Sequence, residues 1–415
     1  MQRLKNYYHL FSGLLANIFY RFPSRGLTII GITGTDGKTT TTSLIYHILK
    51  SSGKKSAMIT TLGAEIDGEK FTHELHVTTP NAWTLQKYLR IAKNKGITHV
   101  ALEVSSHSLD QYRVIGIPFA VGVLTNITHE HLDYHKTYEN YVRTKAKLLQ
   151  RARIAIINHD DGSYTSVLKY LTAKIPQTYS LYNSGAILTL EKFPFTTKLI
   201  GEFNLYNSLA AALAARAVGI GDEKIKQALA TFTAPVGRQE TIYDKEFKVI
   251  SDFAHTPNGF EKLLPALKKI TSGRLIHVFG CVSQRDDSNR PLMGKASSNY
   301  SDIIILTADD PRGESIQKIN QEIKRDIIGF KAISREEYRT GMKNIIIEID
   351  RREKAIGFAV QIAESGDTII STGKSHEKGM NYDGVHEEEW DETRAIKEAL
   401  EKYQSTKFKI TSSKQ

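Results

Sequence analysis

A glycine-rich segment near the start of the chain combines the residue types that can hold a nucleoside triphosphate. Its members are Gly34, Thr35, Asp36, Gly37, Lys38, Thr39 and Thr40. Backbone N–H groups at the start of a helix would face the phosphate oxygens. The Lys38 ammonium would neutralise charge on the β- and γ-phosphates, and the Thr39 hydroxyl could ligate Mg²⁺. The segment therefore predicts a site for a nucleoside triphosphate.

The elements on either side of this segment support the same interpretation. The apolar run 27–32 before it predicts a buried strand, and residues 43–49 after it predict the opening of a helix. The glycines fall at 31, 34 and 37, so the spacing departs from the usual phosphate loop, whose first glycine is replaced here by Ile32. A generic turn is the alternative, but Gly-Lys-Thr-Thr between a strand and a helix favours phosphate binding.

Further candidate ligands follow the next expected strands. Glu103 lies at the end of an expected strand, 99–104, where ligands bind in open α/β sheets. After the strand 120–125 come three histidines and two acids within seven residues, at positions 129–135. No cysteine or distant histidine motif completes a zinc site. One histidine with carboxylates can instead complete the shell of a hard cation such as Mg²⁺.

Strand-like and helical stretches alternate along the chain, which predicts an α/β fold with a mostly parallel sheet. The pattern restarts near residue 236 and indicates a second, doubly wound domain. We expect an amphipathic helix over 1–24, a central ATP-binding domain over 25–235, a C-terminal domain over 236–405 and a flexible polar tail over 406–415.

Composition narrows the class of protein. A formal net charge of +11 suits an anionic ligand, whereas the scattered lysines and the lack of a recognition motif argue against nucleic acid. The single cysteine, Cys281, suits a reducing cytoplasm, and we expect no transmembrane segment. Residues 1–22 form an aromatic, basic helix pattern, which could dock on the protein itself or make a weak contact with a membrane surface or another protein.

The ordered motifs from about residue 28 to residue 403 resemble the Mur ligases, the ATP-dependent amide-forming family of peptidoglycan synthesis. The similarity is greatest to the branch that adds the third amino acid to UDP-N-acetylmuramoyl dipeptide. The resemblance implies that the segment 34–40 holds ATP and that Glu103 and His131 are ligands of two Mg²⁺ ions. It picks Lys145 as the lysine that carries a carbamate formed with CO₂, with Lys147 the alternative on spacing.

The resemblance also implies the remaining site residues. Asn204 and Asn207 are expected on the adenine side of ATP, and Asp252 and His255 in an ATP-facing loop of the C-terminal domain. Contacts with the muramoyl-peptide substrate, the acceptor, are expected from Thr78, Thr79, Ser105, Gln111 and Arg113. Contacts with the incoming amino acid are expected from Asp309, Asp310, Arg312, Gly373 and Glu377, and a further substrate contact is expected from Arg285.

The implied reaction joins a carboxylate and a free amino acid through an acyl phosphate. Arg312 would pair with the distal carboxylate of meso-diaminopimelate in bidentate fashion, although Asp310 stands where the family usually has asparagine. The alternative amino acid is L-lysine. The alternative functions are a related ligase that acts on poly-γ-glutamate, cyanophycin or a folate-glutamate chain, and a non-catalytic ATP-binding partner of another Mur enzyme.

The front end departs from the family pattern. Family members carry a domain before the ATP loop that binds the UDP end of the substrate, whereas 33 residues precede Gly34 here. We therefore expect this chain to lack that domain.

Overall fold

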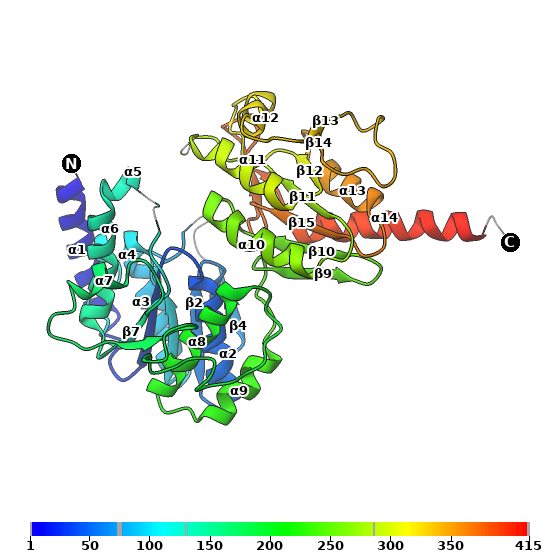
Figure 1. The fold of residues 1–415 in the computed structure, drawn as a ribbon. Helices are drawn as coiled ribbons and strands as arrows, with labels where there is room; N and C mark the ends of the chain where they lie inside the picture. The colour runs from blue at the N-terminus through cyan, green and yellow to red at the C-terminus, as the bar shows by residue number, and fades with distance from the viewer. Residues whose placement is uncertain (1, 73–76, 129, 131, 285–286, 413–415) are drawn as a thin grey trace. The chain divides into compact units, whose positions relative to one another are not determined.

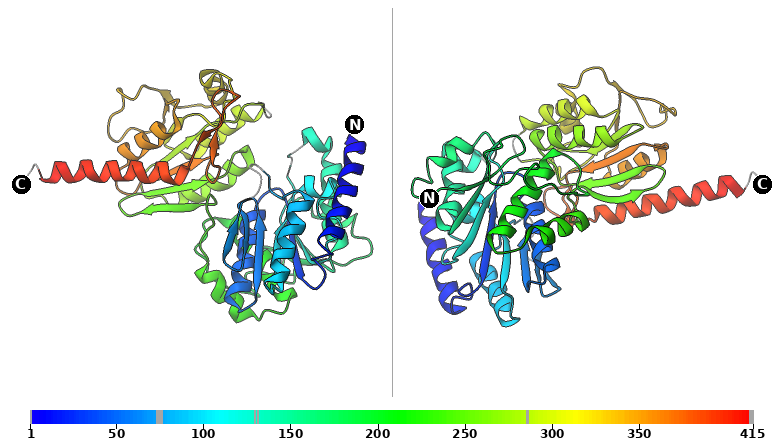
Figure 2. Two further views of the ribbon diagram at one scale, coloured as in Figure 1. Left: turned by 180° about the vertical axis from the view of Figure 1, so that it is seen from behind. Right: turned by 60° about the horizontal axis from the view of Figure 1, so that its bottom comes forward.

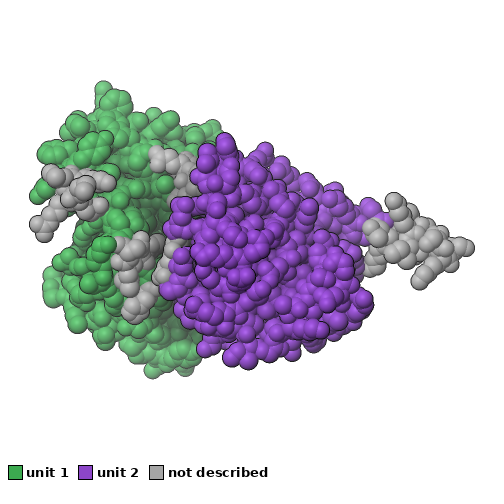
Figure 3. Space-filling view, turned by 90° about the horizontal axis from the view of Figure 1, so that it is seen from above, with its two compact units in different colours: residues 1–233 green, residues 234–415 purple. Residues whose placement is uncertain are grey.

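The computed structural model describes residues 2–72, 77–128, 130, 132–284 and 287–412. The chain divides into two compact units, residues 1–233 and 234–415 (Figure 3). The division falls close to the boundary expected near 236. Each unit is built on its own sheet, and each is described by itself below.

Unit 1 contains an eight-stranded sheet among its described residues. Its strands are β1 (Thr28–Thr33), β2 (Ser56–Thr60), β3 (Gly63–Ile66), β4 (Glu69–Phe71), β5 (His99–Glu103), β6 (Phe119–Leu124), β7 (Ile154–Asn158) and β8 (Gln177–Tyr179). The spatial order is β4-β3-β2-β5-β1-β6-β7-β8. The six strands from β2 to β8 in this order run parallel, while β3 and β4 add an antiparallel edge.

Helices cover both faces of this sheet (Figures 1 and 2). They are α1 (Gln2–Phe19), α2 (Lys38–Ser51), α3 (Ala82–Asn94), α4 (Ser106–Asp110), α5 (Leu132–His135), α6 (Tyr138–Arg151), α7 (Tyr164–Leu168), α8 (Glu202–Ala217) and α9 (Asp222–Thr231). Alternate residues of β1 explain the two layers, because Ile30 and Ile32 pack with α2, α8 and α9 while Ile29 packs with α3 and α6.

Unit 2 contains a seven-stranded sheet among its described residues. Its strands are β9 (Glu240–Asp244), β10 (Lys248–Asp252), β11 (Leu275–Phe279), β12 (Ile303–Leu306), β13 (Lys331–Ala332), β14 (Ile345–Glu348) and β15 (Thr368–Thr372), in the order β13-β14-β12-β11-β15-β10-β9. Only β9 pairs antiparallel in this sheet of the described chain. The strands β16 (Gly379–Met380) and β17 (Glu388–Glu389) pair antiparallel in a separate two-stranded sheet.

The helices of unit 2 are α10 (Pro257–Ile270), α11 (Asn289–Tyr300), α12 (Ile316–Lys324), α13 (Arg352–Ile362) and α14 (Glu392–Ser412). One face of the sheet packs on α13 and α14. On the other face, buried His277 of β11 contacts Phe260 of α10 and Ser297 of α11. Helices on both faces of a mostly parallel sheet confirm the predicted fold class.

Some expectations differ from the structure. The segment after residue 406, expected as a flexible tail, continues α14 to Ser412, because no glycine or proline interrupts the helix. The short strands β3, β4, β13 and β14 were not expected from the sequence; they add to edges of the two sheets. None of the described helices has an apolar stretch sufficient to cross a bilayer.

Candidate active site

The phosphate-loop segment joins β1 to α2, and its two glycines are required by close contacts. A Cβ on Gly34 would lie 1.8 Å from Thr125 Oγ1. Gly37 has a left-handed φ of 78°, and a Cβ there would lie 2.3 Å from Asn207 Oδ1. Only glycine satisfies both the backbone and the space at position 37. The unusual glycine spacing therefore serves a tightly packed turn at the carboxyl end of β1.

Residues after β6 hold this loop from one side. Thr125 Oγ1 donates to the Asp36 carbonyl at 2.6 Å, and Asn126 Oδ1 accepts from the Asp36 backbone N–H at 2.9 Å. The Thr128 N–H donates to Thr35 Oγ1 at 3.0 Å. These contacts hold the loop through Thr35 and Asp36. The sequence reasoning did not assign Thr125 or Asn126 a role; their position after the strand beside β1 was the available signal.

Asn204 and Asn207, expected on the adenine side of ATP, lie buried on α8 behind the loop. Asn207 Oδ1 accepts from Thr41 Oγ1 at 3.2 Å, and its amide donates to Asn204 Oδ1 at 3.0 Å. The contacts of these amides position the start of α2. A direct contact of either residue with adenine stays a prediction.

Thr39 and Glu103 lie together, as a Mg²⁺ site requires. Thr39 Oγ1 is 3.1 and 3.0 Å from the two carboxylate oxygens of Glu103, which is 1% exposed. Thr61 also donates to Glu103, from its N–H at 3.1 Å and its hydroxyl at 3.2 Å. A hydroxyl and a carboxylate are the hard oxygen ligands that Mg²⁺ prefers, and Mg²⁺ commonly keeps several waters. This pair therefore fits the expected ion.

The other expected ligand, His131, lies outside the described residues. Within the described chain, no group of three or more histidine, cysteine, aspartate or glutamate side chains forms a metal cluster.

Lys145 lies on α6, fully enclosed beside the phosphate loop. Its Nζ donates to the Gly34 carbonyl at 2.6 Å and lies 4.5 Å from the centre of the Tyr141 ring. Burial, and secondarily the positive charge of Lys38, lowers the pKa of Lys145 well below its usual value. Lys147, the alternative on spacing, is 39% exposed and pairs with Asp110 at 3.6 Å. The two lysines therefore differ in burial and in partner, and the choice of Lys145 as the carbamate carrier stays a prediction.

A pocket of 310 Å³ joins the loop to the expected acceptor residues. Its lining comprises Gly34, Lys38, Val77, Thr78, Ser105, Ser106, His107, Arg113, Tyr141 and Lys145. Six of these were predicted for phosphate or carbamate chemistry or for substrate: Gly34, Lys38, Thr78, Ser105, Arg113 and Lys145. The fold thus brings four separated segments of the sequence to one cavity, within 34–38, 77–78, 105–113 and 141–145.

The predicted acceptor residues also contact one another. Arg113 donates to the Thr79 carbonyl at 2.8 Å and to Gln111 Oε1 at 2.6 Å. Thr79 Oγ1 accepts from the Ser105 N–H at 2.9 Å and donates to the Glu103 carbonyl at 3.0 Å. The segment containing Thr79 is therefore fastened to the end of β5. The side chains of Arg113 and Ser105 line the pocket beside it.

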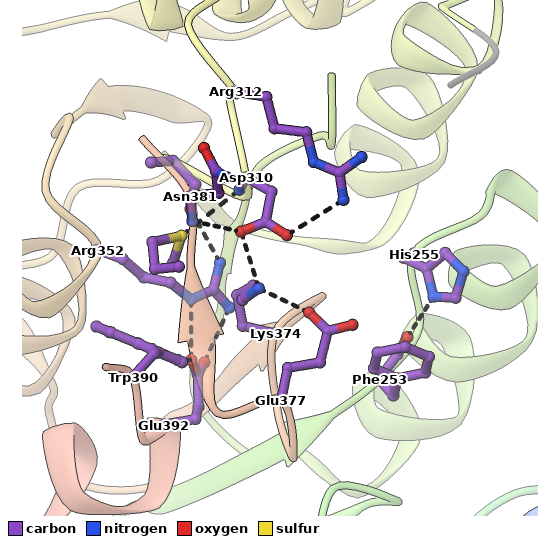
Figure 4. A network of polar contacts seen from close by, with 12 residues as sticks. Phe253, His255, Asp310, Arg312, Arg352, Lys374, Glu377, Asn381, Trp390 and Glu392 are labelled. Atoms are coloured by element: carbon purple, nitrogen blue, oxygen red, sulfur yellow. Dashed lines mark hydrogen bonds and ion pairs between the residues drawn. The ribbon is translucent and has the colours of Figure 1, made fainter. Parts of the chain in front are cut away.

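The expected ATP-facing loop of unit 2 follows β10. Asp252 accepts from the Gln239 N–H at 2.8 Å and from the Ala254 N–H at 2.7 Å, so its carboxylate shapes the turn. His255 Nδ1 lies 2.7 Å from the Phe253 carbonyl (Figure 4). The contact of Asp252 and His255 with ATP stays a prediction.

The residues expected to hold the amino acid form a charged network in unit 2 (Figure 4). Lys374 Nζ donates to Asp310 Oδ1 at 2.9 Å and to Glu377 Oε2 at 2.7 Å. The Asn381 N–H also donates to Asp310 Oδ1, at 3.0 Å. Arg312 Nη2 lies 3.8 Å from Asp310 Oδ2, with its side chain 30% exposed. Lys374 thus compensates the extra charge that Asp310 brings.

Backbone strain marks the same network. Asp310 and Arg312 both have left-handed φ values, 45° and 48°. Such conformations in residues other than glycine cost of order 1–3 kcal/mol and concentrate at functional sites. The Arg312 N–H donates to the Asn381 carbonyl at 3.1 Å, which helps to hold the strained turn.

Asp309 and Gly373 lie against each other beneath the network. A Cβ on Gly373 would lie 2.2 Å from Asp309 Oδ2, at a φ of 104°. Burial raises the pKa of Asp309 to about 7, against the opposing charges of Arg352 and Lys374. For Lys374, burial acts to lower the pKa, but Asp309, Glu377 and Asp310 outweigh it and the pKa is raised. The arrangement favours a charged Lys374.

Arg352 and Lys374 are site residues that the sequence reasoning did not assign. Arg352 forms a fully buried ion pair with Glu392, with Nη2 2.8 Å from Oε1, and donates to the Thr372 carbonyl at 2.6 Å. The pair thereby supports the end of β15, immediately before Gly373. Arg285, expected to bind substrate, lies outside the described residues.

Two protein-family models match the chain. The Mur ligase middle domain matches residues 32–215, and the Mur ligase glutamate ligase domain matches residues 237–375. The two matches fall one in each structural unit.

Curated relatives cover most of the chain. A UDP-N-acetylmuramoyl-L-alanyl-D-glutamate–2,6-diaminopimelate ligase from Aquifex aeolicus is 39% identical, over 94% of this chain and 80% of its own length. A ligase of the same name from Syntrophomonas wolfei is 37% identical, over 93% of this chain and 81% of its own length.

Solved structures show the same architecture. A structure of a UDP-N-acetylmuramoyl-L-alanyl-D-glutamate–2,6-diaminopimelate ligase aligns with a TM-score of 0.64 at 30% identity, covering 92% of this chain and 81% of that one. Folylpolyglutamate synthase from Mycobacterium tuberculosis, complexed with ADP and AMPPCP, aligns with a TM-score of 0.68 at 16% identity, over 88% of this chain and 92% of that one. At that identity the second likeness shows the fold alone.

Proposed function

Because this chain belongs to the Mur ligase family, we propose that it joins diaminopimelate to UDP-N-acetylmuramoyl-L-alanyl-D-glutamate at the expense of ATP. One observation carries the proposal beyond the family. Lys38 of the phosphate loop, buried Lys145 and the acceptor residues Thr78 and Arg113 line a single pocket. Such a pocket can hold a carboxylate beside a terminal phosphate.

The first step brings two anions together. The acceptor carboxylate attacks the γ-phosphorus, the bond from γ-phosphorus to the bridging oxygen breaks, and ADP leaves. Lys38 lowers the repulsion between the reacting groups, since its ammonium lies at the start of α2. Arg113 also lines the pocket, and its guanidinium would hold the carboxylate substrate. The amine of the amino acid then attacks the acyl carbon, and phosphate leaves.

Thr39 and Glu103 would hold Mg²⁺, and His131 is the further ligand proposed by family resemblance. The ion would supply charge stabilisation for the transferring phosphoryl group. Lys145 is suited to carbamate formation with CO₂, because only an uncharged amine reacts and burial lowers the pKa of this lysine. We propose that a carbamate on Lys145 helps to hold a second Mg²⁺.

The network around Arg312 supports the choice of amino acid. Its guanidinium is partly exposed, and a carboxylate of the incoming amino acid could bind it in bidentate fashion. Glu377 would receive an ammonium group of the same molecule. Diaminopimelate offers a carboxylate and an amine at its distal end, whereas lysine offers the amine alone.

The test is a ligation assay with UDP-N-acetylmuramoyl-L-Ala-D-Glu, ATP and a panel of amino acids. We expect ADP release that depends on meso-diaminopimelate and a product whose mass equals the sum of the two substrates less water. A clear preference for L-lysine would overturn the amino-acid assignment. ADP release with folate or glutamate chains alone would overturn the acceptor. Absence of any product would indicate a non-catalytic partner.

Two matched variants test Lys145. We expect Lys145→Ala to lower the ligation rate at least about a hundredfold, because a group that acts on the transferring phosphoryl is worth that much. Lys147→Ala, two residues away on the same helix, should leave the rate nearly unchanged, because the Lys147 side chain is 39% exposed and forms an ion pair with Asp110. Equal losses in the two variants would contradict the assignment.

Two variants test the amino-acid network. Arg312→Lys should raise the KM for meso-diaminopimelate more than it changes kcat, because an ammonium cannot bind a carboxylate in bidentate fashion. Asp310→Asn should leave Lys374 with fewer negative neighbours. An unchanged KM in Arg312→Lys would place the distal carboxylate elsewhere.

A further inference from the structure

Helix α1 presents its large apolar side chains to solvent. Figure 1 shows α1 at an edge of unit 1, and Figure 2 shows it beside α3. The exposed fractions of these side chains run from 39% to 70%. The set comprises Tyr7, Tyr8, Phe11, Leu14, Leu15, Ile18 and Phe19 of α1 with Trp83 of α3. We call these eight residues the α1 face.

The side of α1 that packs on unit 1 is made of small residues. Ala16 and Asn17 are buried, and a Cβ on Gly13 would lie 2.6 Å from Ile115 Cγ2. Asn17 Nδ2 donates to the Ile115 carbonyl at 3.0 Å. An ordinary surface helix buries its large apolar residues and exposes small or polar ones. In α1 the arrangement is reversed, so folding of unit 1 does not account for the large residues.

Specific contacts fix α1 to unit 1. The Trp83 indole N–H donates to Ser12 Oγ at 3.1 Å, and the Trp83 ring lies 5.5 Å from that of Phe19. Arg90 Nε donates to the Tyr20 carbonyl at 3.0 Å, and Lys93 Nζ donates to the Arg25 carbonyl at 3.1 Å. The α1 face is therefore presented in a defined orientation.

Basic residues predominate beside the α1 face, and Asp110, which accepts from Asn6 Nδ2 of α1 at 3.2 Å, is itself paired with Lys147. The sequence holds no aspartate or glutamate before Asp36, and α3 holds none. Arg21, Arg25, Lys87 and Lys93 are exposed beside the face. A second copy of this chain would bring like charges together, whereas an anionic surface would complement them.

We propose that the α1 face binds the surface of a membrane rich in anionic lipid. A helix with an apolar face of aromatic and aliphatic side chains and with basic neighbours lies in the interface plane. Tyrosine and tryptophan prefer the level of the lipid headgroups, and lysine and arginine are attracted to anionic lipids. The α1 face combines all three features. This inference does not depend on the proposed reaction.

The test is co-sedimentation of the full chain with vesicles. We expect binding to phosphatidylcholine vesicles that contain phosphatidylglycerol, weaker binding to phosphatidylcholine alone, and a loss of binding as salt is raised. Phe11→Glu and Ile18→Glu should each lower the bound-to-free ratio about tenfold or more, because a large apolar group leaves the interface and a negative charge enters.

Ile175→Glu is the matched control, because Ile175 is 97% exposed elsewhere in unit 1. It should bind vesicles as the parent chain does. Circular dichroism and ADP release without vesicles should be unchanged in all three variants, since none of the residues lines the pocket. No binding to anionic vesicles, or equal loss in the control, would overturn the proposal. So would a concentration-dependent dimer that Phe11→Glu abolishes, because the face would then bind a second copy.

Discussion

The packing of Gly37 against Asn207 makes a sharp prediction about the phosphate loop. Gly37 and Gly53 lie at the two ends of α2 with nearly equal φ values, 78° and 81°. A Cβ on Gly37 would lie 2.3 Å from Asn207 Oδ1, whereas a Cβ on Gly53 would meet nothing within 4 Å. Replacing either glycine with alanine therefore adds nearly the same conformational free energy to the folded state. The two variants differ only in the contact that the new Cβ makes.

The expected magnitudes follow from these two terms. A left-handed conformation costs an alanine roughly 1–2 kcal/mol, and this applies to both variants. Forcing a methyl group into filled space costs about 1–3 kcal/mol more, and this applies to Gly37→Ala only. Gly53→Ala should therefore lower the free energy of unfolding by about 1–2 kcal/mol, and Gly37→Ala by about 2–5 kcal/mol.

Urea unfolding of unit 1 and binding of a fluorescent ATP analogue are the two assays. Gly37→Ala should also weaken binding of the analogue, because the amides at the start of α2 move with the loop, whereas Gly53→Ala should not. Asn207→Ala combined with Gly37→Ala should cost less than the sum of the single variants, since the contact is already removed. Equal destabilisation by the two glycine variants would refute the reasoning.

Three further predictions concern other parts of the molecule. In unit 2, burial raises the pKa of Asp309 to about 7, so the folded state binds more protons than the unfolded state, and this contribution to stability is lost as pH rises through about 7. In thermal melts, Asp309→Asn should gain stability relative to the parent as pH rises from about 4 to about 7, which are the ordinary and the raised pKa of this carboxyl; a constant difference would contradict this. Glu392→Gln should cost about 3–5 kcal/mol in urea unfolding because Arg352 is left buried and unpaired, whereas Arg352→Met with Glu392→Leu should cost less; a larger loss in the double variant would contradict this. Thr39→Val should raise the Mg²⁺ concentration needed for ligation, since a hydroxyl beside Glu103 is removed; an unchanged requirement would remove Thr39 from the metal site.

Much of the fold could be predicted from local patterns. Apolar runs marked the central strands β1, β5, β6 and β7 nearly to the residue, because buried parallel strands are apolar on both faces. The edge strands β3 and β4 were missed, because edge strands are short and partly polar and give no such run. Helix α14 was ended too early, because a polar composition was taken for disorder although nothing in it breaks a helix.

Parts of the candidate site could likewise be predicted from local patterns, and other parts could not. Glycine, lysine and threonine between a strand and a helix are a local signal, and the sequence determined the phosphate loop by itself. Glu103 was predicted as a Mg²⁺ ligand because it ends a recognisable strand. Family resemblance picked Lys145 over Lys147; the tertiary structure adds that Lys145 is buried beside Gly34, and its carbamate stays a prediction.

The sequence by itself therefore determined the junctions between a strand and a loop at which the candidate site residues lie within a few consecutive positions. What only the tertiary structure decided is which distant side chains meet there. It placed Asn207 behind Gly37, Lys374 beside Asp310, and the large apolar side chains of α1 toward solvent. The physical reason is that burial, close contact and desolvation depend on neighbours brought together by folding, and no local pattern records them.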